Sequence, residues 1–405
     1  MAVTEKHTIL IISALDLWSI GEKQGGPALW QTLMGYANHD WNVYFITGNK
    51  DINSLYDIHP NISITRFDSH FLKRMMRIRH IGLFTRTLWW LFFQGMALLK
   101  AINLGKTNRF NLVYGYEIHG VPVAKLLSRL WHIPVISRFQ GTTIGVFWMH
   151  KRLWKIRVWE HIFAMKIPTD LVIMTNDGTQ GDKVLRKLGA RMDRVKFWLN
   201  GIDMGLFSIL TTKEEAKQQL KINEEFVLLT VSRLDTWKRV DRSVQAMPAI
   251  LKKNPNTILL TVGAGHEKPR LVQLANDIGV SEKIIFAGAI VREKIPLYLA
   301  AADIFMSLFD WSNVGNPLLE AMVAGKCIVT LNNGDTGRFI QNGENGILLE
   351  LNELHKLPDI ICALLKDEIM RNKLSAKAKQ YAKDNFWTWE ARMAAEVQAV
   401  NALIK

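Results

Sequence analysis

The stretch 303–330 constrains the fold more than any other part of the sequence. It begins with a short apolar run, 303–308, that has the composition of a buried parallel strand, and a loop containing Gly315 follows. Pro317 suits the first position of a helix, and Gly325 ends the helical pattern just before a second apolar run. Strand, loop, helix and strand in this order predict a βαβ unit, whose ligand edge lies at the loop.

The loop and helix start of this stretch predict an anion site. Gly315 lets the backbone approach a ligand closely, and the free amides of Leu318 and Leu319 are expected to point out of the helix N-terminus. The candidate contacts in this segment are Gly315, Asn316, Pro317, Leu318 and Leu319. Glu320 follows about one turn into the helix, where its carboxylate can accept hydrogen bonds from a ribose diol. The alternative is a carboxylate that only stabilises the positive helix end, by roughly a few tenths of a kcal/mol.

The same alternation of apolar strands and helical segments fills both halves of the chain. Strands are expected at 8–14, 41–47, 61–65, 112–116, 134–138, 170–175 and 195–199, and then at 226–232, 257–263, 283–287 and 303–308. A chain of 405 residues is long for one core and suits two domains. We therefore predict an α/β protein with one Rossmann-like domain over 1–203, a second over 204–386, and a closing helical segment over 387–405.

The spacing around Glu320 resembles that of the retaining, GT-B-type glycosyltransferases of family four, and the resemblance extends over nearly the whole chain. The mark of that family is a glutamate, seven residues, a second glutamate and an alanine-rich helix. Glu320 matches the second glutamate, but Ser312 stands at the first position, where the family's carboxylate holds hydroxyls of the donor sugar. The resemblance implies two Rossmann-like domains that face a central cleft, and a C-terminal helix that crosses back to the first domain.

Arg233 and Lys238 are the candidate catalytic cations. They lie five residues apart, after the first strand of the second domain, so that both can reach one diphosphate from two sides. Arginine offers a planar fork of donors and lysine a point charge, which stabilise the negative charge that builds on a leaving diphosphate. The same pair is the diphosphate clamp of the resembled family. A generic basic loop is the alternative.

Three segments of the first domain are further candidates. The resemblance implies that the paired glycines Gly25 and Gly26 face the cleft, close to the donor diphosphate and the acceptor, whereas a plain tight turn is the alternative. Family members frequently carry a histidine where Gln140 stands, in contact with the sugar near the reacting carbon. Glutamine can hydrogen-bond a hydroxyl there but cannot shuttle a proton near neutral pH. His119 also follows a predicted strand, and a histidine satisfied within a turn is its alternative.

Two loops of the second domain are expected to border the nucleotide. Gly263 and Gly265 lie in a glycine loop between a strand and a helix, which is weak evidence when taken alone. Ile290 follows the next strand, in a segment that matches the one whose backbone reads the base in the resembled family. The sequence does not decide between uracil and another base.

These residues predict a retaining glycosyltransferase of the hexosyltransferase type, which moves a sugar from a nucleotide-diphosphate donor, with a UDP-sugar as the first expectation. The acceptor is expected to be a hydroxyl of a glycan or of a lipid-linked molecule, in polysaccharide or glycolipid assembly. The leaving diphosphate, held by Arg233, Lys238 and the segment 315–319, would accept the proton of that hydroxyl. No metal and no cofactor are expected, since the sequence has no carboxylate-rich metal motif. The competing class is a catalytically silent partner that binds nucleotide-sugar or lipid in an assembly complex.

The net charge of +14 predicts an anionic partner. Fourteen tryptophans among 51 lysines and arginines favour an anionic membrane surface over a nucleic acid, because tryptophan settles at headgroup level and no nucleic-acid motif is present. Segments 70–108 and 147–166 mix aromatic and basic residues at helical spacing, which predicts amphipathic helices that insert Trp89, Trp90 and Phe93 into the headgroup region. A buried apolar stripe with a solvated basic face is the alternative.

The compartment is predicted from the cysteines and the N-terminus. Cys327 and Cys362 lack metal-ligand spacing and are expected to be buried free thiols, and no signal peptide precedes the first strand. We therefore expect a cytoplasmic protein that is peripheral at the inner face of the membrane.

Overall fold

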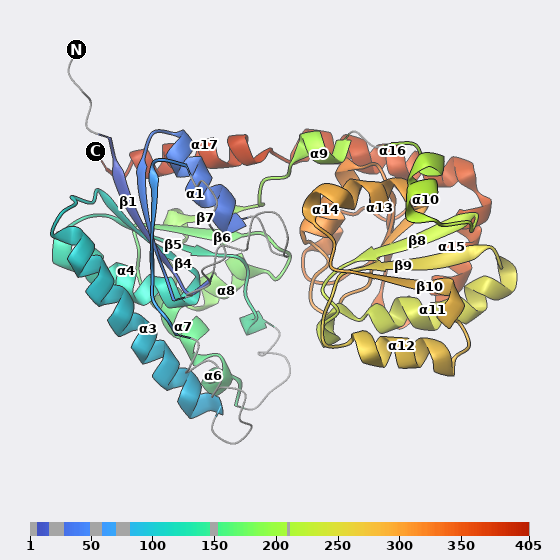
Figure 1. The fold of residues 1–405 in the computed structure, drawn as a ribbon, viewed down its shortest axis with the longest axis horizontal. Helices are drawn as coiled ribbons and strands as arrows, with labels where there is room; N and C mark the ends of the chain where they lie inside the picture. The colour runs from blue at the N-terminus through green and yellow to red at the C-terminus, as the bar shows by residue number, and fades with distance from the viewer. Residues whose placement is uncertain are drawn as a thin grey trace, which may run out of the picture.

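The chain folds into two α/β domains that lie side by side (Figure 1). The structure is a computed structural model, and it describes residues 6–15, 28–48, 59–69, 82–145, 153–208 and 211–404. Gly25 and Gly26, the basic part of the first amphipathic segment and the start of the second therefore lie outside the described residues. Each domain is built on its own parallel sheet, so the predicted α/β class and two-domain GT-B architecture are confirmed.

The first domain contains a seven-stranded sheet in the order β3-β2-β1-β4-β5-β6-β7. Its strands are β1 (Thr8–Ser13), β2 (Asn42–Thr47), β3 (Ile62–Arg66), β4 (Leu112–Tyr116), β5 (Val135–Phe139), β6 (Leu171–Thr175) and β7 (Val195–Trp198). Its helices are α1 (Ala28–Asn38), α3 (Gly82–Gly105), α4 (Glu117–Trp131), α6 (Trp154–Arg157), α7 (Trp159–Lys166) and α8 (Gly181–Lys187). The order reverses between β1 and β4, which makes the carboxyl ends of these two strands a switch point for ligand binding.

The second domain repeats this order on six strands, β10-β9-β8-β11-β12-β13. Its strands are β8 (Phe226–Val231), β9 (Thr257–Val262), β10 (Ile284–Gly288), β11 (Ile304–Ser307), β12 (Cys327–Leu331) and β13 (Ile347–Leu349). Its helices are α9 (Met204–Ser208), α10 (Lys213–Leu220), α11 (Val240–Lys253), α12 (Lys268–Asp277), α13 (Ile295–Ala301), α14 (Asn316–Val323), α15 (Leu357–Lys366) and α16 (Glu368–Asn385). The switch point lies between β8 and β11, where Arg233, Lys238 and Ser312 follow the strands.

Both sheets are buried on both faces, and this explains why their strands are apolar without alternation. In β1, Ile9 and Ile11 pack with the side chains of α1, whereas Leu10 and Ile12 pack on the opposite face with those of α3 and α4. The central strands of the second sheet divide their side chains between two core clusters in the same way. The strand β13 was not predicted, because three residues are too few to give a sequence pattern.

The last helix, α17 (Trp389–Asn401), lies on the first domain, where it packs on α1 (Figure 1). A fully buried charge cluster holds it there: Glu396 accepts from Arg392 at 2.8 Å and from Tyr114 at 2.8 Å, and it pairs with Arg138 of β5 at 3.3 Å. The chain thus crosses between the domains twice, and the two crossings are joined by a hydrogen bond from the Ile202 amide to the Trp387 carbonyl at 3.0 Å. This is the crossing that the resemblance implied.

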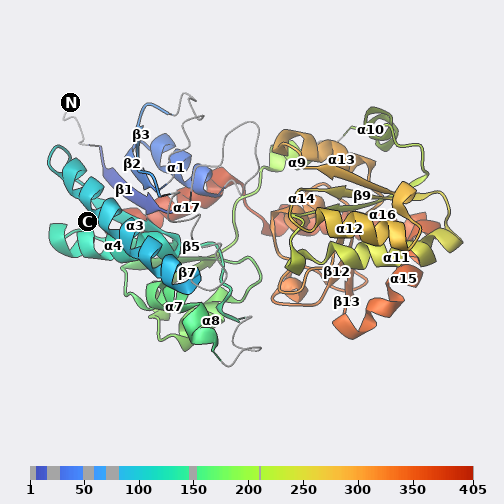
Figure 2. The same ribbon diagram turned by 60° about the horizontal axis from the view of Figure 1, so that its bottom comes forward.

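Helix α3 forms the outer edge of the first domain (Figure 2). Its buried stripe follows a spacing of four residues, and it consists of Thr85, Trp89, Phe93, Ala97 and Ala101. The prediction that Trp89 and Phe93 insert into a membrane is therefore wrong, since both rings face the sheet. The ridge that remains exposed is aliphatic with two phenylalanines, and it consists of Leu83, Phe84, Leu88, Leu91, Phe92, Leu99 and Ile102. In the part of the chain that is described, no helix combines the length and the hydropathy needed to cross a bilayer.

Candidate active site between the two sheets

A cavity of about 310 Å³ lies between the domains, at the carboxyl ends of strands from both sheets. Its first-domain wall comes from the ends of β4, β5 and β6 and from α7, and it includes Glu117, Gln140, Asp177 and His161. Its second-domain wall comes from the loops after β8 and β11. The described residues of that wall are Trp237, Lys238, Trp311, Ser312, Val314 and Gly315. Two switch points therefore meet at one hollow, as expected for a site that binds two ligands.

Lys238 of the predicted clamp lines this cavity, and its ammonium lies 3.9 Å from the ring centroids of both Trp237 and Phe309. Burial, and then the nearby guanidinium of Arg233, lower its pKa to about 7. Arg233 itself is 65% exposed and pairs with Asp235 at 3.2 Å. Lys238 thus lies in the cavity lining, and Arg233 lies near enough to lower its pKa, so an anion bound between them would be stabilised by two cations.

The helix start after β11 differs from its prediction. Asn316 is the first residue of α14 and Pro317 the second, so the helix begins one residue earlier than expected. As a result, the amides of Leu318 and Leu319 donate to the Gly315 carbonyl, at 3.0 and 3.2 Å, and the prediction that they are free for an anion is wrong. Among the described residues, the amide of Asn316 is the one in this turn that keeps no intramolecular acceptor.

Ser312 makes the contact that joins the two domains at the cavity. Its hydroxyl donates to the Asp177 carbonyl at 2.6 Å, and the amide of Asp335 donates to the neighbouring Gly178 carbonyl at 3.0 Å. Gly178 has φ +79°, and a Cβ there would lie 2.0 Å from the Ser312 Oγ, so neither position has room for a larger side chain. A serine at the first position of the family motif is therefore compatible with a cleft closed to this extent, whereas a glutamate would collide with Gly178.

Glu320 is buried on α14 and pairs with Arg292 at 3.3 Å. Burial raises its pKa to about 7, although the Arg292 guanidinium opposes this shift. Nothing in the sequence around Arg292 suggested this role, because it lies 28 residues before Glu320. A ribose diol bound here would donate two hydrogen bonds to the Glu320 carboxylate in place of its ion pair with Arg292. The ribose contact of Glu320 stays a prediction.

The glycine loop after β9 serves first to pack two loops together. A Cβ at Gly263 would lie 1.8 Å from the Ser232 carbonyl oxygen, and one at Gly265 would lie 2.3 Å from the Leu234 oxygen. These glycines therefore let the backbone beside the clamp lie directly on the loop after β8. Ile290, in the segment expected to read the base, is partly buried and packs against the core of the second domain.

Gln140 lies in the cavity wall, but its side chain belongs to a polar network behind that wall. The amide orientation that satisfies its neighbours accepts hydrogen bonds from Arg138 at 3.0 Å and from Tyr116 at 2.7 Å. The backbone amide of Gln140 donates to Glu117 at 2.6 Å. Gln140 thus connects the cavity to the charge cluster under α17, whereas His119 packs its ring on Trp89 and lies outside the cavity lining.

Three titratable residues of the first wall were missed by the sequence analysis. Burial raises the pKa of Glu117 to about 7 and that of Asp177 to about 6, and burial lowers the pKa of His161 to about 4. The Nδ1 atom of His161 is buried and has no hydrogen-bond partner among the described residues. The sequence did contain a positional signal for two of them. Glu117 directly follows a predicted strand, and one residue separates Asp177 from the end of another.

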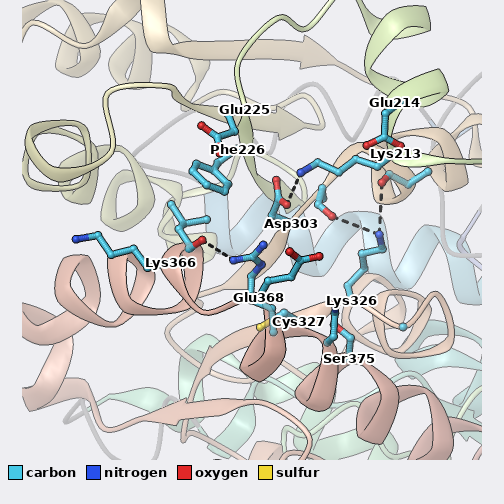
Figure 3. Close-up of a pocket in the computed structure, with 16 residues that line it drawn as sticks. Lys213, Glu214, Glu225, Phe226, Asp303, Lys326, Cys327, Lys366, Glu368 and Ser375 are labelled. Carbon is cyan, nitrogen blue, oxygen red and sulfur yellow. Dashed lines mark hydrogen bonds and ion pairs between the residues drawn. The ribbon is translucent and has the colours of Figure 1, made fainter.

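A larger hollow, of about 680 Å³, lies at the opposite edge of the second sheet (Figure 3). It is lined by residues at the amino ends of the strands, such as Phe226, Asp303 and Lys326. Two of its lysines are already engaged: Lys213 pairs with Asp303 at 2.5 Å, and Lys326 donates to the carbonyls that end α13. Because ligands of open α/β sheets bind at the carboxyl ends of strands, the cavity between the domains is the better candidate site.

Fold and site together define a two-domain protein of the GT-B class. Comparisons with known proteins give the family. Residues 212–381 match the family described as glycosyl transferases group 1. An uncharacterised glycosyltransferase of Methanocaldococcus jannaschii is 31% identical over 369 residues, which cover 86% of this chain and 87% of that protein. The chain belongs to the group 1 glycosyltransferase family.

Other relatives match over less of their length. A GDP-mannose-dependent alpha-(1-6)-phosphatidylinositol monomannoside mannosyltransferase of Mycobacterium tuberculosis is 25% identical over 185 residues, which cover 44% of this chain and 48% of that protein. The chain thus spans about half the length of the first relatives that it matches. Among solved structures, sucrose-phosphate synthase of Thermosynechococcus elongatus has a TM-score of 0.79 with 19% identity, covering 98% of this chain and 99% of that one. Likeness at this identity shows a shared fold.

Proposed function

We propose that the protein is a retaining glycosyltransferase that moves a sugar from a nucleotide-diphosphate donor, first of all a UDP-sugar, to a hydroxyl of a glycan or lipid-linked acceptor. The observation that carries this proposal is the meeting of two sheet switch points at one cavity, with Lys238 and Arg233 on the second-domain side. A diphosphate at these cations would place its glycosidic bond toward the carboxylate-bearing first-domain wall.

The proposed chemistry keeps all proton transfers on the substrates. The acceptor oxygen forms a bond to the anomeric carbon while the bond from that carbon to the diphosphate oxygen breaks, and the electron pair remains on the diphosphate. That diphosphate then takes the acceptor's proton on the same face. Arg233, Lys238 and the Asn316 amide would stabilise the charge that develops, and the cleft would hold the reactants in place, so this mechanism invokes no metal ion.

A nucleotide panel tests this function. We expect the full-length protein to be stabilised by UDP or by another nucleoside diphosphate, because a ligand at a hundredfold over its dissociation constant adds about 2.7 kcal/mol. The matching nucleotide-sugar should be hydrolysed slowly, since transfer to water is the background reaction of a transferase. Binding without hydrolysis or transfer would instead favour the silent nucleotide-sugar-binding partner, for which Ser312 and Gln140 are the motivating residues.

We further propose that the exposed ridge of α3 attaches the protein to an anionic membrane at its cytoplasmic face. Apolar side chains on the neighbouring elements extend the ridge, and they are Leu126, Leu130, Leu153, Ile156 and Phe163. The exposed cations Lys155 and Arg157 of α6 lie beside them. Exposed apolar side chains on neighbouring elements, together with nearby cations, fit a lipid interface. The phosphatidylinositol acceptor named for the mycobacterial relative supports this partner, and the buried free thiols of Cys327 and Cys362 support the compartment.

Flotation with anionic vesicles tests the membrane proposal. The double variant Phe84→Glu, Leu91→Glu should lose binding, because two charges replace apolar groups that are 65% and 55% exposed. Ile369→Glu is the matched control, since Ile369 is 84% exposed but lies on α16 of the second domain. Wild-type protein that stays entirely in the soluble fraction at low salt would refute the membrane attachment and leave a soluble acceptor.

A further inference from the structure

The first-domain wall of the cavity is acidic, and this limits what can bind against it. Among its described residues none is a lysine or arginine, and its titratable side chains are Glu117, Asp177 and His161. Burial is the main cause of the raised pKa of Glu117. The two carboxyls are also close enough for the charge of Asp177 to raise this pKa further. Near pH 7 a phosphate group placed here would meet the negative charge of Asp177 and, in part, that of Glu117, whereas a hydroxyl group can donate to either carboxyl group.

The backbone at Glu117 is held in a conformation that a glutamate rarely adopts. Its φ is +62°, at the junction where β4 passes into α4 without a loop, in the left-handed region that residues other than glycine seldom occupy. The hydrogen bond from the Gln140 amide fixes one carboxyl oxygen, at 2.6 Å. Strain of this kind persists where the surrounding structure fixes the geometry, and the carboxyl of Glu117, which lines the cavity, keeps further acceptor positions beyond this one bond.

The facing wall contains an aromatic pair, and the Lys238 ammonium lies over one of its rings, that of Trp237. The rings of Trp237 and Trp311 are stacked with centroids 5.0 Å apart and planes 7° apart, and both residues line the cavity. A surface that combines a stacked aromatic pair with carboxylate acceptors on the opposite side suits a sugar ring, which has an apolar face and hydroxyls at its edge. The unpartnered Nδ1 of His161 adds a third polar group for such hydroxyls.

We propose that Glu117 and Asp177 accept hydrogen bonds from hydroxyls of an uncharged sugar acceptor, and that this wall rejects phosphorylated acceptors at the reacting end. The inference rests on the proposed transferase function and assigns its acceptor class. Both residues act in acceptor specificity, and the bond-making and bond-breaking steps are unchanged. A phosphate further along a lipid-linked acceptor lies outside the cavity and is compatible with the proposal.

The test measures binding of methyl glycosides to the full-length protein saturated with UDP or GDP, by ligand-observed NMR. The probes are the methyl α-glycosides of glucose, galactose, mannose and N-acetylglucosamine, each compared with its 6-phosphate. At least one neutral glycoside should bind at least about tenfold more tightly than its phosphate, because like charges face the latter. Glu117→Gln should weaken that neutral glycoside by roughly threefold or more, and the double variant Glu117→Gln, Asp177→Asn should narrow the preference against phosphate.

Glu214→Gln is the matched control, since this exposed glutamate lines the hollow at the far edge of the second sheet and should change neither affinity. A 6-phosphate that binds as tightly as its neutral counterpart would overturn the proposal. So would unchanged glycoside affinity in Glu117→Gln, or the absence of binding by every neutral glycoside. Loss of nucleotide binding itself would instead refute the proposed transferase function, so the two failures are distinguishable.

Discussion

The two walls of the interdomain cavity are built by the same topology but carry opposite chemistry. Each wall lies near the switch point of a parallel sheet. The strand order around that point is β3-β2-β1-β4 in the first sheet and β10-β9-β8-β11 in the second. The second-domain wall presents Lys238, with the exposed Arg233 close enough to lower its pKa, whereas the first-domain wall presents Glu117 and Asp177. The fold thus determines where the site lies, whereas the loop residues determine which substrate binds against which wall.

The largest expected effect comes from removing the charge of the second wall. Lys238→Ala and Arg233→Ala should each lower turnover at least about a hundredfold, the scale of losing one preorganised donor to a developing anion. Steady-state kinetics of transfer or of donor hydrolysis measures this. Lys268→Ala, which removes an exposed lysine of α12, is the control. Near-normal turnover in either clamp variant would remove that residue from the site.

The second effect concerns stability, and it follows from the buried carboxyl of Glu320. Its pKa is about 7 in the folded protein against 4.5 for an ordinary glutamate, so the folded state holds a proton that the unfolded state releases between these pH values. Stability therefore falls as pH rises from about 4.5 to about 7, by up to about 3 kcal/mol for a shift of this size. The Glu320→Gln variant has no carboxyl at this position and does not lose this stability. The free energy of unfolding of the variant minus that of the wild type should therefore increase from pH 5 to pH 8.

Urea denaturation at the two pH values measures this difference, and Glu390→Gln, at an exposed site on α17, should show none. In Glu320→Gln, the affinity for donor and for free nucleotide should fall together, because the ribose loses a charged acceptor. If the nucleotide affinity is unchanged, the Glu320 carboxylate does not hold the ribose and only stabilises the positive end of helix α14.

A smaller effect is expected where the two walls touch. Ser312→Ala removes the hydroxyl that donates to the Asp177 carbonyl at 2.6 Å, a bond worth about 1 kcal/mol, and should shift the domains toward a more open arrangement. Ser312→Glu should open them further, because Gly178 leaves no space for the longer side chain. Small-angle X-ray scattering of the nucleotide-free proteins measures the opening.

The same Ser312→Glu variant should also change the order of preference among nucleotide-sugars. If every tested donor keeps its relative rate, Ser312 has no part in donor choice and acts in domain contact alone.

The smallest effect is a proton taken up with the nucleotide. The pKa of Lys238 is about 7 without ligand, so near pH 7 about half of the molecules carry a neutral amine. A diphosphate should raise this pKa, so binding at pH 7 takes up about half a proton, and the affinity falls roughly threefold per pH unit around pH 7 and approaches about tenfold per unit well above it. Calorimetry in two buffers of different ionisation enthalpy measures the uptake. Lys238→Arg should abolish it, because arginine stays charged.

Local patterns in the sequence determined much of this protein. The apolar runs predicted every strand but β13, to within one or two residues, because strands buried on both faces have a continuous apolar composition. The predicted site residues Lys238, Ser312 and Gly315 line the second-domain wall, because they follow two strand ends in short contiguous loops, whereas Arg233 and Glu320 are not among the described residues that line the cavity.

Only the tertiary structure decided the opposite wall and the outer surface. Glu117, Asp177 and His161 come from separate elements, and the parallel order of β4, β5 and β6 brings their loops to one edge. Their shifted pKa values arise from burial, which no local pattern records. Helix α3 is apolar around much of its circumference, so the sequence contained no signal for the side that faces the sheet. Cap geometry likewise decided where α14 begins. The helix starts one residue earlier than expected, and the amides of Leu318 and Leu319 are therefore hydrogen-bonded to the Gly315 carbonyl.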